Sequence, residues 1–110
     1  MRGIQRSLTL ETKHINKHLP NTPEMQRLLR QEGCVHIFKD ENTLKEVAQS
    51  IITEGEFTGM IRGSERYGLF FLEPIGYRFT IDGNQKPLYY GEIKITGDRY
   101  HVIPRTRPSK

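Results

Sequence analysis

Two histidines, His14 and His18, stand four positions apart near the start of this 110-residue chain. On a helix this spacing places both imidazoles on one face, about one turn apart. Such a pair suits proton transfer beside one substrate, because imidazole titrates near neutral pH. It also suits a divalent metal if a third ligand converges on it. The alternative is a pair of surface histidines beside Lys13 and Lys17.

The surrounding sequence argues against the metal interpretation. Glu11 is the one acidic residue near the pair, the glutamate of an HExxH motif is absent, and His101 lies far off along the chain. The single cysteine, Cys34, excludes an internal disulfide and a zinc site built from a cysteine cluster. We therefore expect neither a metal nor a cofactor.

The second half of the chain is rich in cations that suit a phosphate, since a fixed cation stabilises negative charge where it develops. The candidates are Arg62, Arg66, Arg78, Lys94, Arg99, Arg105 and Arg107. His101, beside Tyr100, is a candidate second imidazole. The alternative for the C-terminal arginines is a solvated basic tail.

Composition and charge narrow the class of protein. Hydrophobic residues make up 35% of the chain and charged residues 27%, as in a polar but folded domain. The length suits one domain over residues 1–110. Seventeen Lys and Arg against 13 Asp and Glu give a net charge of +4, which favours nucleic acid or an acidic protein as partner. No signal peptide or membrane-spanning apolar run is present, so a cytoplasmic location is expected.

Residues 8–55 are expected to be mainly helical. A first short helix is predicted from Thr9 to about Leu19, before Pro20. A second follows the Thr22-Pro23 cap and ends at Gly33. A short apolar strand is expected at 34–38. A third helix, capped by Asp40 or Asn42, has apolar residues at helical spacing and ends at Gly55: Leu44, Val47, Ala48, Ile51 and Ile52.

The sequence pattern of residues 60–104 predicts an antiparallel β-meander. Strands are expected at 67–72, 77–81, 88–96 and 100–103, separated by turn-forming residues. The four glycines between 55 and 68 lack nucleotide-binding spacing, so this segment is expected to be a mobile loop. The fold class is therefore α+β, with two or three N-terminal helices packed on an antiparallel sheet of about four strands.

The order of several segments resembles a known family. The segment from His14 to Thr22 is followed by Leu28 to Arg30, by the step Phe38-Lys39-Asp40 into a helix, and by a glycine turn and aromatic strand at 97–104. This order resembles the RNase A-like toxin domains at the C-termini of bacterial contact-dependent inhibition and other polymorphic toxins. Two departures stand out: Pro104 and Thr106 replace the family's terminal threonine motif, and the chain has no tryptophan.

The resemblance implies metal-independent RNA cleavage, in which a base activates a ribose 2′-hydroxyl and an acid protonates the leaving oxygen. His14 or His18 would be the base or acid, with His101 as partner, and Thr106 a hydrogen-bonding candidate. The phosphate-binding candidates are Lys17, Arg62, Lys94 and Arg105.

The resemblance also implies partners and a place of action. The substrate would be RNA, with tRNA as one candidate, inside the producing or a target bacterial cell. An acidic immunity or antitoxin protein would suit the +4 charge. The alternative function is a non-catalytic basic module of the same fold that binds nucleic acid or protein. Oligomeric state does not follow from the sequence.

Overall fold

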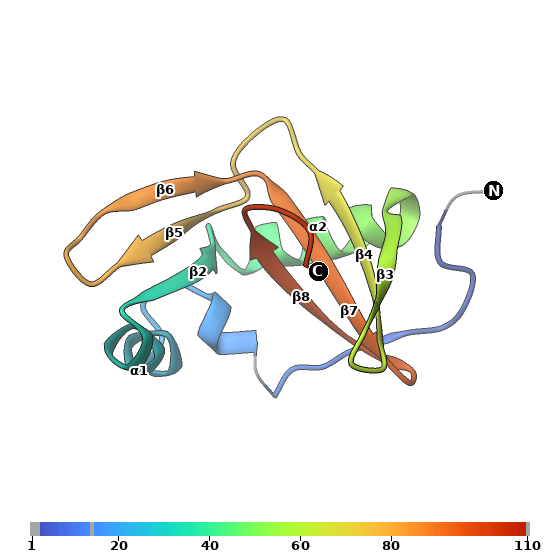
Figure 1. Ribbon diagram of the computed structural model, residues 1–110, viewed down its shortest axis with the longest axis horizontal. Helices are drawn as coiled ribbons and strands as arrows, with labels where there is room; N and C mark the ends of the chain where they lie inside the picture. Colours follow the sequence, from blue (N-terminus) through green and yellow to red (C-terminus); the bar gives the residue numbers. More distant parts are fainter. Residues whose placement is uncertain (1–2, 14, 110) are drawn as a thin grey trace.

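The computed structural model describes residues 3–13 and 15–109, and it confirms the α+β class (Figure 1). Two α-helices and a short 3-10 helix, η1, pack against two sheets. In chain order the elements are β1 (Thr9–Leu10), η1 (Ile15–His18), α1 (Pro23–Glu32), β2 (Cys34–Phe38), α2 (Glu41–Glu54), β3 (Glu56–Ile61), β4 (Ser64–Phe70), β5 (Gly76–Thr80), β6 (Gln85–Leu88), β7 (Tyr90–Thr96) and β8 (Arg99–Arg105).

The strands form two sheets instead of one meander. The larger has the order β1-β8-β7-β4-β3, in which β1 runs parallel to β8 and the other pairs are antiparallel. The smaller is antiparallel, with the order β2-β5-β6. Strand β4 pairs with β7 and not with β5. After β4 the chain crosses to β2, where the Ile75 carbonyl accepts from the Lys39 amide at 3.0 Å.

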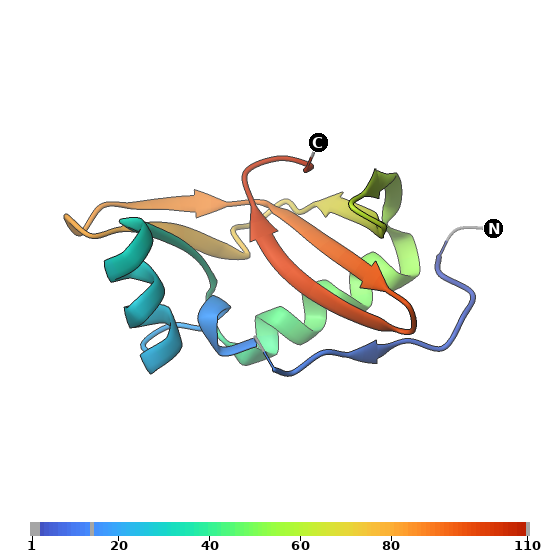
Figure 2. The same cartoon turned by 60° about the horizontal axis from the view of Figure 1, so that its bottom comes forward.

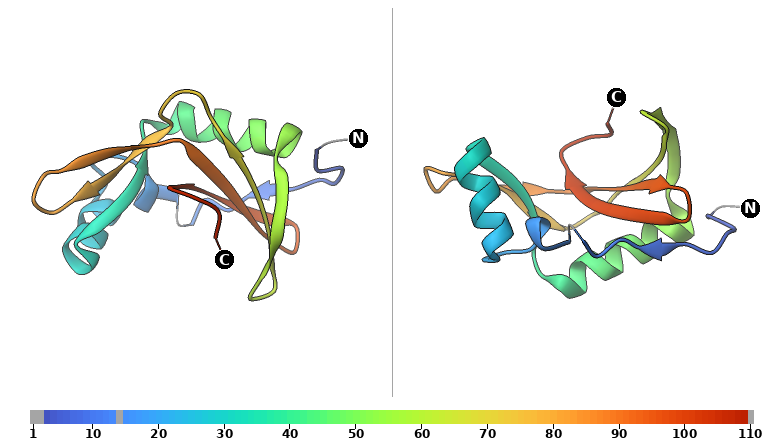
Figure 3. Two further views of the ribbon diagram at one scale, coloured as in Figure 1. Left: turned by 45° about the horizontal axis from the view of Figure 1, so that its top comes forward. Right: turned by 90° about the horizontal axis from the view of Figure 1, so that it is seen from below.

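Helix α2 covers one face of the larger sheet, and the C-terminal tail lies on the other (Figures 2 and 3). The buried face of α2 is the one that its apolar spacing predicts: Leu44, Val47, Ala48 and Ile51. Gly91 of β7 permits the close approach, because a Cβ there would lie 2.6 Å from Val47 Cγ1. The larger of the two core clusters therefore lies between α2 and the strands β7 and β8, and the smaller lies between α1 and β2.

The second and third predicted helices, α1 and α2, begin and end where their caps indicate. The Thr22 hydroxyl accepts from the Met25 amide at 3.1 Å at the start of α1, and Gly33 ends it in the left-handed region at φ 80°. At the start of α2, the Asp40 carboxylate accepts from the Thr43 amide at 2.7 Å. The short strand β2 is also found as predicted.

The helix predicted from residue 9 to 19 is wrong. This segment is the two-residue strand β1 followed by the single turn η1. The Thr9 amide donates to Asp98 and the Glu11 amide to Tyr100, both at 2.8 Å, so the backbone bonds the edge of β8 instead of itself. His14 lies outside the described residues.

The mobile loop predicted at 55–68 is also wrong, because these residues form the β3–β4 hairpin. Arg62 and Gly63 at its turn have φ of 52° and 81°. Two successive positive φ values are what a type I′ hairpin turn requires. Within the described residues, no helix has the length and apolar character needed to cross a membrane.

Candidate active site

A pocket of about 480 Å³ lies where η1 and the end of β1 meet β7 and β8. Four of the predicted site residues line it together: Lys17, His18, Lys94 and His101. Glu11, Lys13 and Ile103 complete the lining. The two histidines thus come from opposite ends of the chain.

Strands β7 and β8 position Lys94 and His101. The two residues are register partners on neighbouring antiparallel strands, so their side chains extend from the same face of the sheet. That face is turned away from α2, because the alternate residues Ile93 and Ile95 pack in the core against the helix. Both side chains are half-buried.

The turn η1 positions Lys17 and His18. Leu19, directly after it, is buried in the core. The Thr22 hydroxyl donates to the Asn16 carbonyl, and this bond ties η1 to the first turn of α1. A packed leucine and a side-chain bond thus hold a turn that is too short to be stable alone.

The ring of His18 is held in one tautomer. Its Nδ1 lies 2.9 Å from the carbonyl oxygen of His36, and since a carbonyl only accepts, Nδ1 carries the proton. Burial, helped by the nearby positive charges of Lys17 and Arg105, lowers the pKa of His18 to about 4, although the hydrogen bond to the His36 carbonyl acts to raise it. At neutral pH the ring is therefore uncharged, with a lone pair on Nε2.

His36 extends this arrangement to β8. Its Nδ1 donates to the Pro104 carbonyl at 3.1 Å, and burial lowers the pKa of its imidazole as well. Sequence reasoning missed this residue, because it stands in an apolar strand and its partner lies 68 positions along the chain. His36 thus links the turn that carries His18 to the strand that carries His101.

The pocket has a positive electrostatic character. Three lysines line it against one carboxylate, Glu11. That carboxylate is engaged: Oε2 lies 3.3 Å from the Arg99 guanidinium and Oε1 accepts from the Lys13 amide at 3.1 Å. The pocket therefore suits an anion with several oxygens, such as a phosphodiester.

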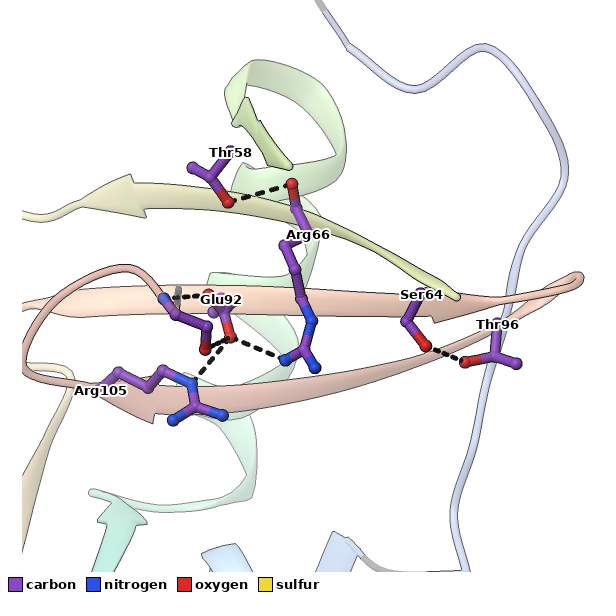
Figure 4. Close-up of polar contacts among 7 residues, drawn as sticks. Thr58, Ser64, Arg66, Glu92, Thr96 and Arg105 are labelled. Carbon is purple, nitrogen blue, oxygen red and sulfur yellow. Dashed lines mark hydrogen bonds and ion pairs between the residues drawn. The ribbon is translucent and has the colours of Figure 1, made fainter. Parts of the chain in front are cut away.

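A fully buried carboxylate, Glu92, lies on the same face of the sheet (Figure 4). Its Oε1 accepts from Arg66 at 3.2 Å and from Arg105 Nε at 2.8 Å. Ser109 donates to it twice, from its amide at 3.0 Å and from its hydroxyl at 2.7 Å. Glu92 thereby holds Arg105 in place and fastens the C-terminal tail. In the sequence, only its position as a single acidic residue in an otherwise largely apolar strand could have pointed to this role.

The remaining predicted residues lie outside this pocket. Arg62 occupies the β3–β4 turn, and the exposed Thr106 follows the end of β8. Arg105 pairs with Glu92 but stands close enough to His18 to lower its pKa. Arg78 is the register partner of His36 in the smaller sheet.

Metal ligands do not gather here. Across residues 3–13 and 15–109, no three His, Cys, Asp or Glu side chains lie close enough together to hold an ion. The chemistry available at the pocket is that of imidazoles and lysines.

A family model described as Domain of unknown function (DUF6972) matches residues 6–109. The chain belongs to this family. The DUF6972 match contains every residue that lines the pocket, from Glu11 to Ile103. No curated protein and no solved structure matches the chain.

Proposed function

We propose that this protein is a small metal-independent ribonuclease, which cleaves RNA by attack of a ribose 2′-hydroxyl on the adjacent phosphate. The observation that carries the proposal is the pocket itself, in which His18 and His101 are joined by Lys17 and Lys94. Two imidazoles beside fixed cations are what in-line transesterification needs: a base, an acid and charge stabilisation.

In this mechanism His18 is the base. Its Nε2 lone pair accepts the 2′-hydroxyl proton while the Nδ1–H bond to the His36 carbonyl keeps the ring oriented. The 2′-oxygen forms a bond to phosphorus, and the bond to the 5′-oxygen breaks as His101 protonates that oxygen. Lys94 and Lys17 neutralise the dianionic phosphorane. The products are a 2′,3′-cyclic phosphate and a 5′-hydroxyl.

The resemblance to RNase A-like toxin domains supports the same reaction. It adds RNA, tRNA included, inside a bacterial cell as the target, and an acidic immunity or antitoxin protein as a partner. The pocket lysines and the net charge of +4 suit both polyanions.

The first test is cleavage of labelled single-stranded RNA and tRNA in excess EDTA. We expect His18→Ala and His101→Ala each to lower kcat/KM by about 10²–10⁴-fold, the usual contribution of a general acid or base. Lys94→Ala is expected to lower it as well, whereas Arg27→Ala, which removes an exposed charge from α1, leaves it unchanged. Absence of cleavage between about pH 5 and 8, or full activity in both histidine variants, contradicts the proposal.

A non-catalytic nucleic-acid-binding module is the second candidate. The observation that favours it is the presence of Lys13, Lys17 and Lys94 in one pocket, since three lysines bind phosphate without any proton transfer. It predicts salt-sensitive RNA binding by wild type with no cyclic phosphate product.

A further inference from the structure

A second hollow, of about 290 Å³, opens on the same sheet and is lined by aromatic and apolar residues together with Glu56 and Thr58. Phe70 of β4 and Tyr90 of β7 form it, with Gly68 at its base and Pro108 of the tail at its wall. Gly68 is required here, because a Cβ at this position would overlap the Tyr90 hydroxyl. Gly68 thus leaves the room on β4 that the Tyr90 hydroxyl occupies.

Both hollows lie on one face of the sheet. Tyr90 and Lys94 occupy alternate positions of β7, so their side chains point to the same side, away from α2. Three residues of strand lie between Tyr90 and Lys94, so the two positions are about 13 Å apart at the usual rise per residue. A bound strand that spans both hollows would run past the C-terminal tail, whose Ser109 is bonded to Glu92 between them.

The aromatic pair presents a ring to solvent. Phe70 is 63% exposed, whereas Tyr90 beneath it is 3% exposed, and their ring centroids lie 4.5 Å apart. A buried ring thus supports an exposed one, which limits the rotamers that Phe70 adopts. A preorganised exposed aromatic is the usual platform on which an unpaired base stacks.

A cation lies between the two hollows. Arg105 is the register partner of Tyr90, and Glu92 fixes its Nε at 2.8 Å. The same guanidinium stands close enough to His18 to lower the pKa of that histidine. A phosphate between the scissile group and a base in the hollow would therefore meet Arg105.

The charge around the aromatic hollow selects a base over a phosphate. Glu56 lines it, and burial together with the charges of Glu92 and Glu56 raises the pKa of Tyr90 to about 12. Glu92 is already paired with Arg66 and Arg105, and a phosphate in the hollow would be repelled by Glu56. An uncharged planar ring is not, and a carboxylate accepts bonds from the amino groups of bases.

We propose that the Phe70–Tyr90 hollow binds a base of the RNA whose scissile phosphate occupies the His18–His101 pocket, so that the substrate is single-stranded RNA. The inference rests on the proposed function. Bases of an RNA duplex stack on one another, so an unpaired base alone is free to stack on Phe70. Arg105 then holds the intervening backbone.

Cleavage kinetics test this subsite with a matched pair of variants. Phe70→Ala removes the platform, and Phe57→Ala removes a phenylalanine that is 55% exposed on β3 outside both hollows. We expect Phe70→Ala to raise KM for a single-stranded RNA about tenfold and to leave kcat/KM for a dinucleotide unchanged. Phe57→Ala is expected to change neither. Equal KM values for wild type and Phe70→Ala overturn the subsite but leave the ribonuclease proposal standing.

Fluorescence provides a readout that does not need cleavage. The chain has no tryptophan, so Phe70→Trp and Phe57→Trp each introduce a single reporter. The probe is a single-stranded DNA of about ten nucleotides, within the usual site size, which lacks the attacking 2′-hydroxyl. Quenching in the Phe70→Trp variant but not in the Phe57→Trp variant supports the subsite, whether or not wild type cleaves RNA. If wild type cleaves no RNA, that finding overturns the ribonuclease proposal and leaves the subsite standing. Absence of quenching in both variants overturns the subsite.

Discussion

His18 and His36 each donate the Nδ1 proton to a main-chain carbonyl, and burial lowers the pKa of both. The two bonds join η1, β2 and β8. The same arrangement that leaves a lone pair on His18 Nε2 therefore also makes the fold sensitive to acid.

We expect the protein to lose stability as pH falls from about 6.5 to about 4, the window set by the pKa of His18. In this window the unfolded chain binds more protons than the folded one, so acid favours unfolding. The free energy of unfolding should drop by up to about 3 kcal/mol from His18. Urea unfolding at the two ends of the window measures it. In His18→Gln the drop should shrink, and an unchanged drop would contradict the assignment.

Glu92 gives a second prediction about a single residue. Glu92→Leu leaves Arg66, which is 6% exposed, buried without its carboxylate. Loss of one partner of a buried ion pair costs about 3–5 kcal/mol of unfolding free energy. The double variant Glu92→Leu, Arg66→Leu should recover much of this loss, because the cation that then lacks a carboxylate, Arg105, is partly exposed to solvent. Thermal unfolding of both variants measures the two changes in unfolding free energy. A loss below about 1 kcal/mol in the single variant contradicts a buried ion pair.

At the scale of elements, the Thr22 hydroxyl helps to hold the turn that carries His18. The Thr22 hydroxyl accepts from the Met25 amide in the first turn of α1 and donates to the carbonyl of Asn16, the second residue of η1. Asp40 caps α2 in the same way, but α2 lies on the far face of the sheet from the pocket. Loss of either cap should therefore lower the stability of the fold, but only loss of the Thr22 hydroxyl should disturb the geometry of the site.

Thr22→Ala and Asp40→Ala should each lower the free energy of unfolding by about 1 kcal/mol. Thr22→Ala is expected also to lower RNA cleavage, because η1 loses its attachment to α1, whereas Asp40→Ala leaves cleavage unchanged. Thr22→Ser should restore both properties. Denaturation curves and cleavage rates below the unfolding transition measure the two effects. Equal cleavage by the two alanine variants would show that Thr22 does not position the site.

Local sequence patterns predicted both α-helices, but they failed for the segment that precedes α1 and for the segment that follows α2. Thr22, Gly33 and Asp40 are caps whose effect depends on neighbours within a few residues. The segment at 9–19 instead bonds the edge of β8, and the Gly-rich segment at 55–68 pairs with itself and with β7. Long-range pairing overrides a local pattern in both.

The whole molecule sets a positive field at the pocket. Lys13, Lys17 and Lys94 line it, and the net charge of the chain is +4. If each lysine neutralises one phosphate, the slope of log K against log salt for single-stranded RNA should be about −2. Lys94→Ala should reduce its magnitude by about 0.7, and the exposed Arg27→Ala on α1 should not change it. Filter binding over a salt series measures the slope; affinity that does not vary with salt contradicts a phosphate site.

The sequence by itself determined the α+β class, the two capped helices and the residue types of the candidate site. These features depend on interactions within a few residues, which a sequence displays directly. Only the tertiary structure decided that His18 meets His101 and Lys94, and that His36 orients His18. That outcome follows from the strand order, which sets β8 beside β1 and β7 and brings η1 and β2 against it. Such pairings join residues tens of positions apart and leave no local pattern.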